Sequence, residues 1–126
     1  MIVNDPQTKA AVEQAFAEYE TALVTNDVEA LDGFFWNDPL AIRYGGGENL
    51  YGFDAIAAFR ASRPSVGLMR SLEATVITTF GKDVATDCTL FRRDSAPGSI
   101  GRQSQTWALT SEGWKIVAAH VSVIPE

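Results

Sequence analysis

Apolar residues near the start of the chain recur every three or four positions, and this spacing predicts an amphipathic helix. The members of the stripe are Val12, Phe16, Tyr19 and Leu23. Asp5 followed by Pro6 is typical of a helix start, with the aspartate as the cap and the proline in the first turn. The helix is expected to end at about Thr25, and Tyr19 then belongs to its buried face.

Shorter elements are predicted between this helix and the middle of the chain. Asn26, with Glu29 three residues later, indicates the cap of a short second helix. Apolar residues alternate over 40–44, which predicts a strand on which Arg43 points away from Leu40 and Ile42. A glycine turn at 45–47, a returning strand at 48–51 and a third helix over 53–62 complete this part, and Arg63-Pro64 ends the third helix.

The second half of the chain reads as strands joined by short turns. The expected strands are 69–80, 84–93, 100–109 and 114–123. Connections this short require antiparallel pairing of successive strands. The expected class is therefore α+β, with three helices against one face of a curved sheet. A second copy of the chain would cover the other face, so a homodimer is expected.

Length and charge narrow the function. The 126 residues suit a single domain spanning 1–126, and the hydrophobic fraction of 46% is enough for a core. A net charge of −6 argues against nucleic acid and against anionic membranes as partners. We expect a cytoplasmic protein, because the N-terminal residues lack the pattern of a signal peptide. Cys88 is the only cysteine, so no internal disulfide can form.

The basic residues include arginines spread over the later part of the chain. They are Arg43, Arg60, Arg63, Arg70, Arg92, Arg93 and Arg102. An acidic protein of this kind can still bind a small anion if one or two of these side chains point inward.

Four local stretches carry a resemblance that extends over nearly the whole chain. They are WNDP at 36–39, RYG at 43–45, ENLYG at 48–52 and GRQSQTW at 101–107. With the order of elements, they resemble the AtzH-like, or oxalurate-catabolism HpxZ-like, family of the nuclear-transport-factor-2-like (SnoaL-like, cystatin-like) superfamily. The resemblance implies a cone-shaped fold in which three helices pack on a curved mixed or antiparallel sheet.

The resemblance also implies a chemistry. Family members resemble partners of amidases in nitrogen-compound catabolism, with a proposed decarboxylating amidohydrolase step that converts 1,3-dicarboxyurea to allophanate. The implied catalytic pair is Tyr19 and Arg43, with no metal and no cofactor. The residue types suit the reaction, because an arginine fork can hold a carboxylate and a tyrosine hydroxyl can pass a proton.

Further residues are candidates for binding a small carboxylated urea or amide. On the predicted strand 100–109, one face carries Gln103, Gln105, Trp107 and Leu109, of which we take Gln105 and Trp107 as pocket residues. The other substrate-binding candidates are Trp36, Asn49, Tyr51 and Phe91. Each also has a structural interpretation, as part of the core, of the pocket wall or of a dimer contact.

Two polar residues remain open at this level. Asp87 is either a base in the pocket or a residue at a sheet edge, and His120 is better explained as an interface residue than as a catalytic one. A second function is open as well. The protein would then bind a small anion without turnover, or associate with an amidase as an accessory protein.

Overall fold

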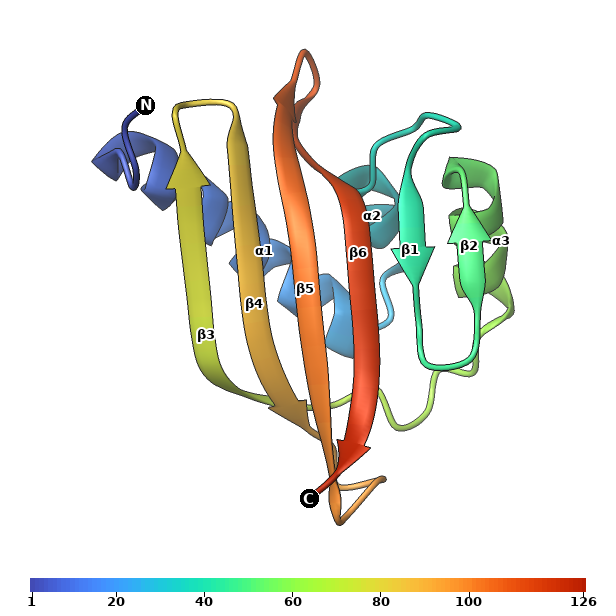
Figure 1. Ribbon diagram of the computed structural model, residues 1–126. Helices are drawn as coiled ribbons and strands as arrows, with labels where there is room; N and C mark the ends of the chain where they lie inside the picture. The colour runs from blue at the N-terminus through green and yellow to red at the C-terminus, as the bar shows by residue number, and fades with distance from the viewer.

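A computed structural model describes residues 1–126 and shows three helices behind one six-stranded sheet (Figure 1). The helices are α1 (Pro6–Val24), α2 (Val28–Phe34) and α3 (Phe53–Ser62), and the strands are β1 (Ile42–Tyr44), β2 (Asn49–Tyr51), β3 (Ser71–Phe80), β4 (Val84–Arg92), β5 (Ser99–Thr110) and β6 (Gly113–Pro125). The predicted elements are all present, with boundaries that differ by only a few residues.

The helix caps explain where the first two helices begin. The Asp5 side chain accepts a hydrogen bond from the Thr8 backbone N–H, as expected for the cap of α1. The prediction that Asn26 caps α2 is wrong, because Asn26 has a φ of 52° and its N–H donates to the Leu23 carbonyl at the end of α1. The cap is Asp27, whose carboxylate accepts from the Ala30 N–H at 3.1 Å.

The strand order is β2-β1-β6-β5-β4-β3. Successive strands from β3 to β6 pair antiparallel, as their short turns require, and so do β1 and β2. β1 instead runs parallel to β6, with Arg43 opposite Ala119. Because α3 and three long strands separate β1 from β6 in the chain, no short turn constrains their relative direction. The sheet is therefore mixed.

The sheet curves around α1, and an irregularity in β3 contributes to the curvature (Figure 1). The pairing of β3 with β4 shifts register between Glu73 and Val76, and Ala74 between them has a φ of 52°. An extra residue in one strand bends that strand and increases its twist. The sheet thus has a concave face, which the helices cover.

The core fills the space between the helices and the concave face. Its 13 buried residues include Val12, Tyr19 and Leu23 from α1, and Trp107 and Ile116 from the sheet. The periodicity of the first helix therefore predicted its buried face correctly. None of the helices is both long enough and apolar enough to cross a membrane.

Candidate functional site

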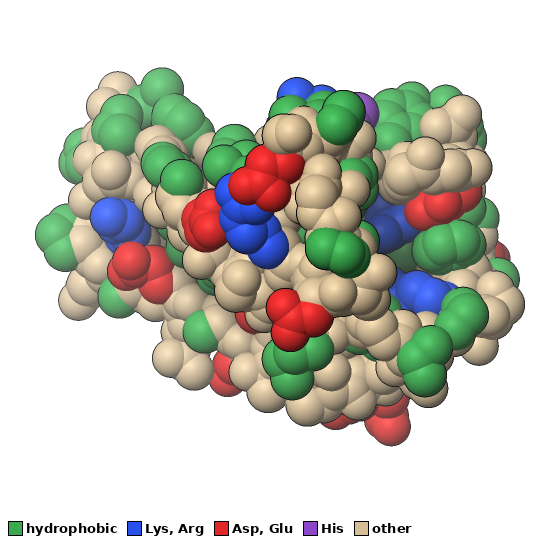
Figure 2. Space-filling view, turned by 90° about the horizontal axis from the view of Figure 1, so that it is seen from below, with side chains coloured by type: hydrophobic (Ala, Val, Ile, Leu, Met, Phe, Trp, Pro, Cys, Tyr) green, Lys and Arg blue, Asp and Glu red, His purple; other side chains and the backbone are tan.

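A cavity of about 290 Å³ is lined by residues of α1, α3 and the sheet, and by the segment between α3 and β3. Its lining includes both predicted catalytic residues, together with Leu23, Glu48, Phe59, Arg63, Gly67, Leu68, Arg70, Arg93, Gln103 and Val121. The view from below shows Lys and Arg side chains recessed between hydrophobic and other side chains (Figure 2). The size suits a small molecule, and four of the lining residues are arginines.

Tyr19 forms part of the wall contributed by α1. Its side chain is only 4% exposed, and aromatic rings surround it. The Tyr19 ring makes edge contacts with Phe34 at 6.0 Å and with Trp107 at 6.4 Å between ring centroids, and it lies tilted beside Phe35. These contacts fix the direction of the ring at the edge of the cavity.

Arg43 enters the cavity from β1. Its Nη1 donates to Glu48 Oε1 at 2.9 Å, and its guanidinium lies 5.5 Å from the centre of the Phe59 ring. The side chain of Arg43 is 13% exposed. Glu48 therefore offsets the charge of Arg43 while the arginine still faces the cavity.

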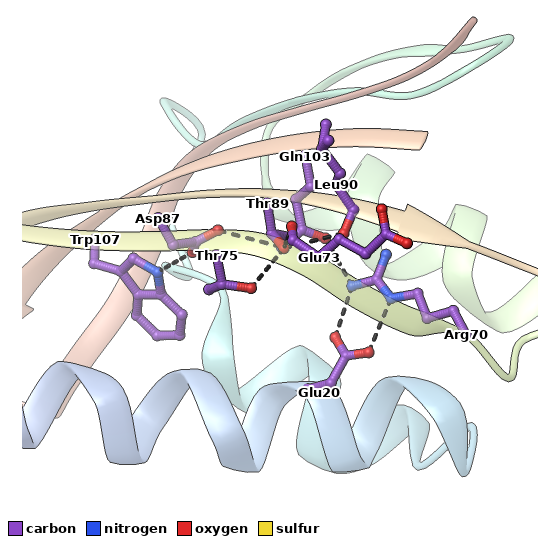
Figure 3. Close-up of polar contacts among 9 residues, drawn as sticks. All are labelled: Glu20, Arg70, Glu73, Thr75, Asp87, Thr89, Leu90, Gln103 and Trp107. Atoms are coloured by element: carbon purple, nitrogen blue, oxygen red, sulfur yellow. Dashed lines mark hydrogen bonds and ion pairs between the residues drawn. The ribbon is translucent and has the colours of Figure 1, made fainter. Parts of the chain in front are cut away.

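A chain of hydrogen bonds runs from α1 across the floor of the cavity into the core (Figure 3). Arg70 donates to both carboxylate oxygens of Glu20, at 2.9 and 2.7 Å, and to Gln103 Oε1 at 2.8 Å. Gln103 Nε2 donates to Asp87 Oδ1 at 3.3 Å, and Trp107 Nε1 donates to Asp87 Oδ2 at 2.7 Å. The Gln103 amide is thus held at both ends, which fixes the direction of its oxygen and its nitrogen.

Asp87 is fully buried, and its burial changes its acidity. Desolvation raises the pKa of this carboxyl to about 6, although the hydrogen bonds from Trp107 and Gln103 act in the opposite direction. Asp87 does not line the cavity and lies behind Gln103. It is therefore placed to orient Gln103 rather than to touch a ligand.

Arg63 and Arg93 differ from the other two arginines of the cavity, because neither has a carboxylate partner. Nε and Nη2 of Arg63 and Nε of Arg93 are buried without any hydrogen-bond partner. Burial lowers the pKa of both guanidinium groups, and neighbouring arginines lower it further. Buried donors of this kind are costly unless a ligand satisfies them.

The ring of Phe91 packs against the guanidinium groups of two arginines of the cavity, Arg70 and Arg93. The guanidinium groups of Arg70 and Arg93 lie 4.6 and 4.7 Å from the centre of its ring. The ring covers Gly101 on the neighbouring strand so closely that a Cβ there would lie 2.1 Å from it. Phe91 is buried and does not line the cavity itself, so its part is to position the cations that do.

The other predicted binding residues lie outside this cavity. Trp107 and Gln105 are buried in the core, and Gln105 Oε1 has no hydrogen-bond partner. Asn49 and Tyr51 are exposed on β2, where the Tyr51 hydroxyl is hydrogen-bonded to Tyr44 at 2.9 Å. Trp36 lines a separate cavity of about 330 Å³.

That separate cavity offers fewer groups that could bind an anion. It is lined by Asp32, Gly33, Phe35, Trp36, Asn37, Phe53, Thr110, Ser111, Glu112 and Lys115, with no arginine among them. None of its side-chain atoms is both buried and without a partner. We therefore take the Tyr19 cavity as the candidate functional site.

Sequence reasoning missed Arg63, Arg70, Arg93 and Gln103 as residues of the site. One signal for Arg93 was present, because adjacent residues at the end of a strand point to opposite sides and Arg92 and Arg93 are neighbours. Arg92 points outward, where it pairs with Glu73 and Glu126. Gln103 shares its sheet face with Gln105, but only its position along the strand brings it to the cavity.

The residues considered for other chemistry do not join the site. Cys88 and His120 are both exposed, and Ser104 lies opposite each of them on neighbouring strands of the uncovered sheet face. No three side chains of histidine, cysteine, aspartate or glutamate gather closely enough to hold a metal ion.

Comparison with known proteins places the chain in a family. The AtzH-like family model matches residues 1–126. The chain belongs to the AtzH-like family. A comparison with curated proteins found no significant match.

Solved structures related to this AtzH-like chain show the same fold. A protein of unknown function from the DUF3225 family of Pectobacterium atrosepticum is 54% identical, with a TM-score of 0.95 over 97% of this chain and 94% of that chain. A cystatin-like fold protein from Burkholderia xenovorans is 51% identical, with a TM-score of 0.95 over 100% and 98% of the two chains. An NTF2-like protein from Cytophaga hutchinsonii is only 17% identical but has a TM-score of 0.71 over 91% and 97%. The fold is therefore the NTF2-like, cystatin-like α+β fold, as the resemblance implied.

Proposed function

We propose that this protein is an enzyme of nitrogen-compound catabolism that removes one carboxylate, as carbon dioxide, from a small dicarboxylated urea. The substrate that fits the AtzH-like resemblance is 1,3-dicarboxyurea, and the product is allophanate. The observation that carries the proposal is the cavity itself, in which Tyr19 from α1 and Arg43 from β1 line one space with three further arginines.

The reaction breaks the bond between a carboxylate carbon and the urea nitrogen. The electron pair of that bond stays on the nitrogen, carbon dioxide leaves, and the nitrogen takes up one proton. The dianion thus becomes a monoanion, and hydration of the carbon dioxide makes the overall change equal to hydrolysis of a C–N bond. Tyr19 would donate the proton and recover one from water, while Arg43 would orient the carboxylate.

The geometry supports these roles in two ways. The rings of Phe34 and Trp107 hold the Tyr19 ring in one direction, so that its hydroxyl can meet a ligand without reorganisation. The ion pair with Glu48 holds the Arg43 guanidinium in place at the cavity, so that it can orient a carboxylate.

Turnover by two single variants tests the proposal. Tyr19→Phe removes the proton donor but keeps the ring in place, and we expect kcat to fall by about 10²-fold or more. Arg43→Ala should cost a similar factor in kcat/KM. Release of allophanate and carbon dioxide from dicarboxyurea is the measurement.

Tyr44→Phe is the matched control. Its hydroxyl contacts Tyr51 and lies outside the cavity, so turnover should stay at the wild-type rate. Wild-type turnover by Tyr19→Phe would rule out the tyrosine as proton donor.

The second candidate function is binding without turnover. The unpartnered guanidinium atoms of Arg63 and Arg93 favour an anion ligand whether or not chemistry follows. A wild-type protein whose melting temperature rises with dicarboxyurea, but which releases no product, would support this function. Co-purification with a defined amidase would support the accessory role.

A further inference from the structure

Two of the four arginines in the cavity, Arg63 and Arg93, have buried nitrogens without a hydrogen-bond partner in the protein, which leaves them free to bind a ligand. We propose that the cavity is a dicarboxylate site in which Arg63 and Arg93 hold the carboxylate that is retained, while Tyr19 and Arg43 face the carboxylate that is lost. The inference deepens the proposed function, and it rests on that function only for the distinction between the two carboxylates.

The pairing of charges shows which cations are left for a ligand. Arg70 is occupied by Glu20 and Gln103, and its side chain is only 2% exposed. Arg43 is paired with Glu48. Arg63 and Arg93 have neither an ion pair nor a hydrogen bond for their buried nitrogens.

Arg63 and Arg93 line the same small cavity, so one ligand can contact both. The charge of Arg63 lowers the pKa of Arg93, and the charge of Arg70 lowers the pKa of both. Burial is the larger cause in each case. A carboxylate placed between the two would satisfy buried donors and relieve the repulsion between like charges.

The chemistry of decarboxylation explains why the two ends of the site differ. A carboxylate that leaves as carbon dioxide must give up its negative charge, so a strong cation beside it stabilises the ground state more than the transition state. Glu48 offsets the charge of Arg43 at that end. No such offset is needed at Arg63 and Arg93, because the retained carboxylate keeps its charge throughout.

Unreactive ligands test the site apart from catalysis. Glutarate has the same number of chain atoms between its carboxylates as dicarboxyurea, and pentanoate replaces one carboxylate by a methyl group. By isothermal titration calorimetry, we expect the wild-type protein to bind glutarate at least tenfold more tightly than pentanoate. In Arg63→Met and Arg93→Met, glutarate affinity should fall about tenfold or more, and the preference for glutarate should shrink.

Melting temperatures show that the effect is on binding and not on folding. Removing an unpaired, partly buried cation should leave the melting temperature of the unliganded protein unchanged or raise it, because the cation is costly without a ligand. Arg93→Lys keeps the charge but loses the planar fork, so it should fold normally and bind glutarate more weakly. Arg102→Met, on the outer face of β5 and away from the cavity, is the control for glutarate binding and should leave the affinity unchanged.

Two results would overturn the inference. One is a wild-type protein that binds glutarate no more tightly than pentanoate, and the other is undiminished glutarate binding by folded Arg63→Met and Arg93→Met. Failure of the proposed function looks different. In that case the wild-type protein prefers glutarate, and the two arginine variants lose this preference, but dicarboxyurea is not turned over.

Discussion

Asp87 is a carboxyl group enclosed by the core on the inner face of β4. It accepts hydrogen bonds from Trp107 and Gln103, and Gln103 in turn accepts one from Arg70 (Figure 3). Because a carboxylate accepts and does not donate, Asp87 forces the Gln103 amide to present its nitrogen inward and its oxygen toward Arg70. One residue thus sets the direction of polar groups along the floor of the cavity.

The acidity of Asp87 predicts how stability depends on pH. Its pKa rises from 3.8 to about 6 on folding, so the folded state binds the proton more tightly than the unfolded state. Asp87 therefore adds its whole contribution to the free energy of unfolding below about pH 4. This contribution is lost as the pH rises through 6. Between pH 4 and 7.5 the loss should be roughly 2 kcal/mol.

The variant Asp87→Asn isolates this contribution, because asparagine has nearly the same shape and does not titrate. Urea unfolding of both proteins across the pH range gives the difference in the free energy of unfolding. The wild-type protein should lose stability relative to Asp87→Asn as the pH rises. A difference that stays constant from pH 4 to 7.5 would contradict the assignment.

At the scale of the elements, two adjacent residues determine the junction of α1 and α2. Asn26 takes a left-handed conformation after α1, and Asp27 caps α2 through the Ala30 N–H. Both residue types suit a cap, so the sequence does not distinguish them. The direction of the chain after α1 distinguishes them, because only the Asp27 side chain reaches a free N–H group of α2.

Substitutions at this junction separate the two assignments. Asp27→Ala should lower the free energy of unfolding by about 1 kcal/mol, as for other lost caps. Asp27→Asn should cost much less, and Asn26→Gly should be neutral or slightly stabilising because glycine accepts a positive φ. Urea unfolding measures all three. A larger loss for Asn26→Gly than for Asp27→Ala would restore Asn26 as the cap.

At the scale of the molecule, the helices leave one broad face of the sheet uncovered (Figure 1). Apolar and small residues are exposed on its strands, among them Val76, Cys88 and Ser104. Tyr44 and His120 pack edge to face on β1 and β6. A face of this composition supports the expectation of a homodimer.

The dimer can be tested by sedimentation. We expect the wild-type protein to sediment as a dimer, and Ser104→Glu, which places a charge at the centre of the uncovered face, to shift it toward the monomer. Ala17→Glu puts the same charge on the exposed side of α1 and should leave the dimer intact. A monomeric wild-type protein at micromolar concentration would end the expectation.

The sequence determined the elements and their buried faces, because those depend on short-range patterns. The period of α1 placed Tyr19 on the inner side, and the alternation of β5 placed Gln103, Gln105 and Trp107 together. The resemblance in the four short stretches gave the family, and it implied Tyr19 and Arg43 as the expected catalytic pair. These statements need only the conformations of neighbouring residues and a comparison of sequences.

Only the tertiary structure decided which side chains share the cavity. Arg43 comes from β1, Arg63 and Arg70 from the segment between α3 and β3, and Arg93 from the end of β4. Whether such arginines meet depends on the parallel pairing of β1 with β6 and on the curvature of β3, which are set by contacts between distant parts of the chain. The same holds for the two guanidinium groups without partners, because the sequence shows a charge but not whether another part of the chain neutralises it.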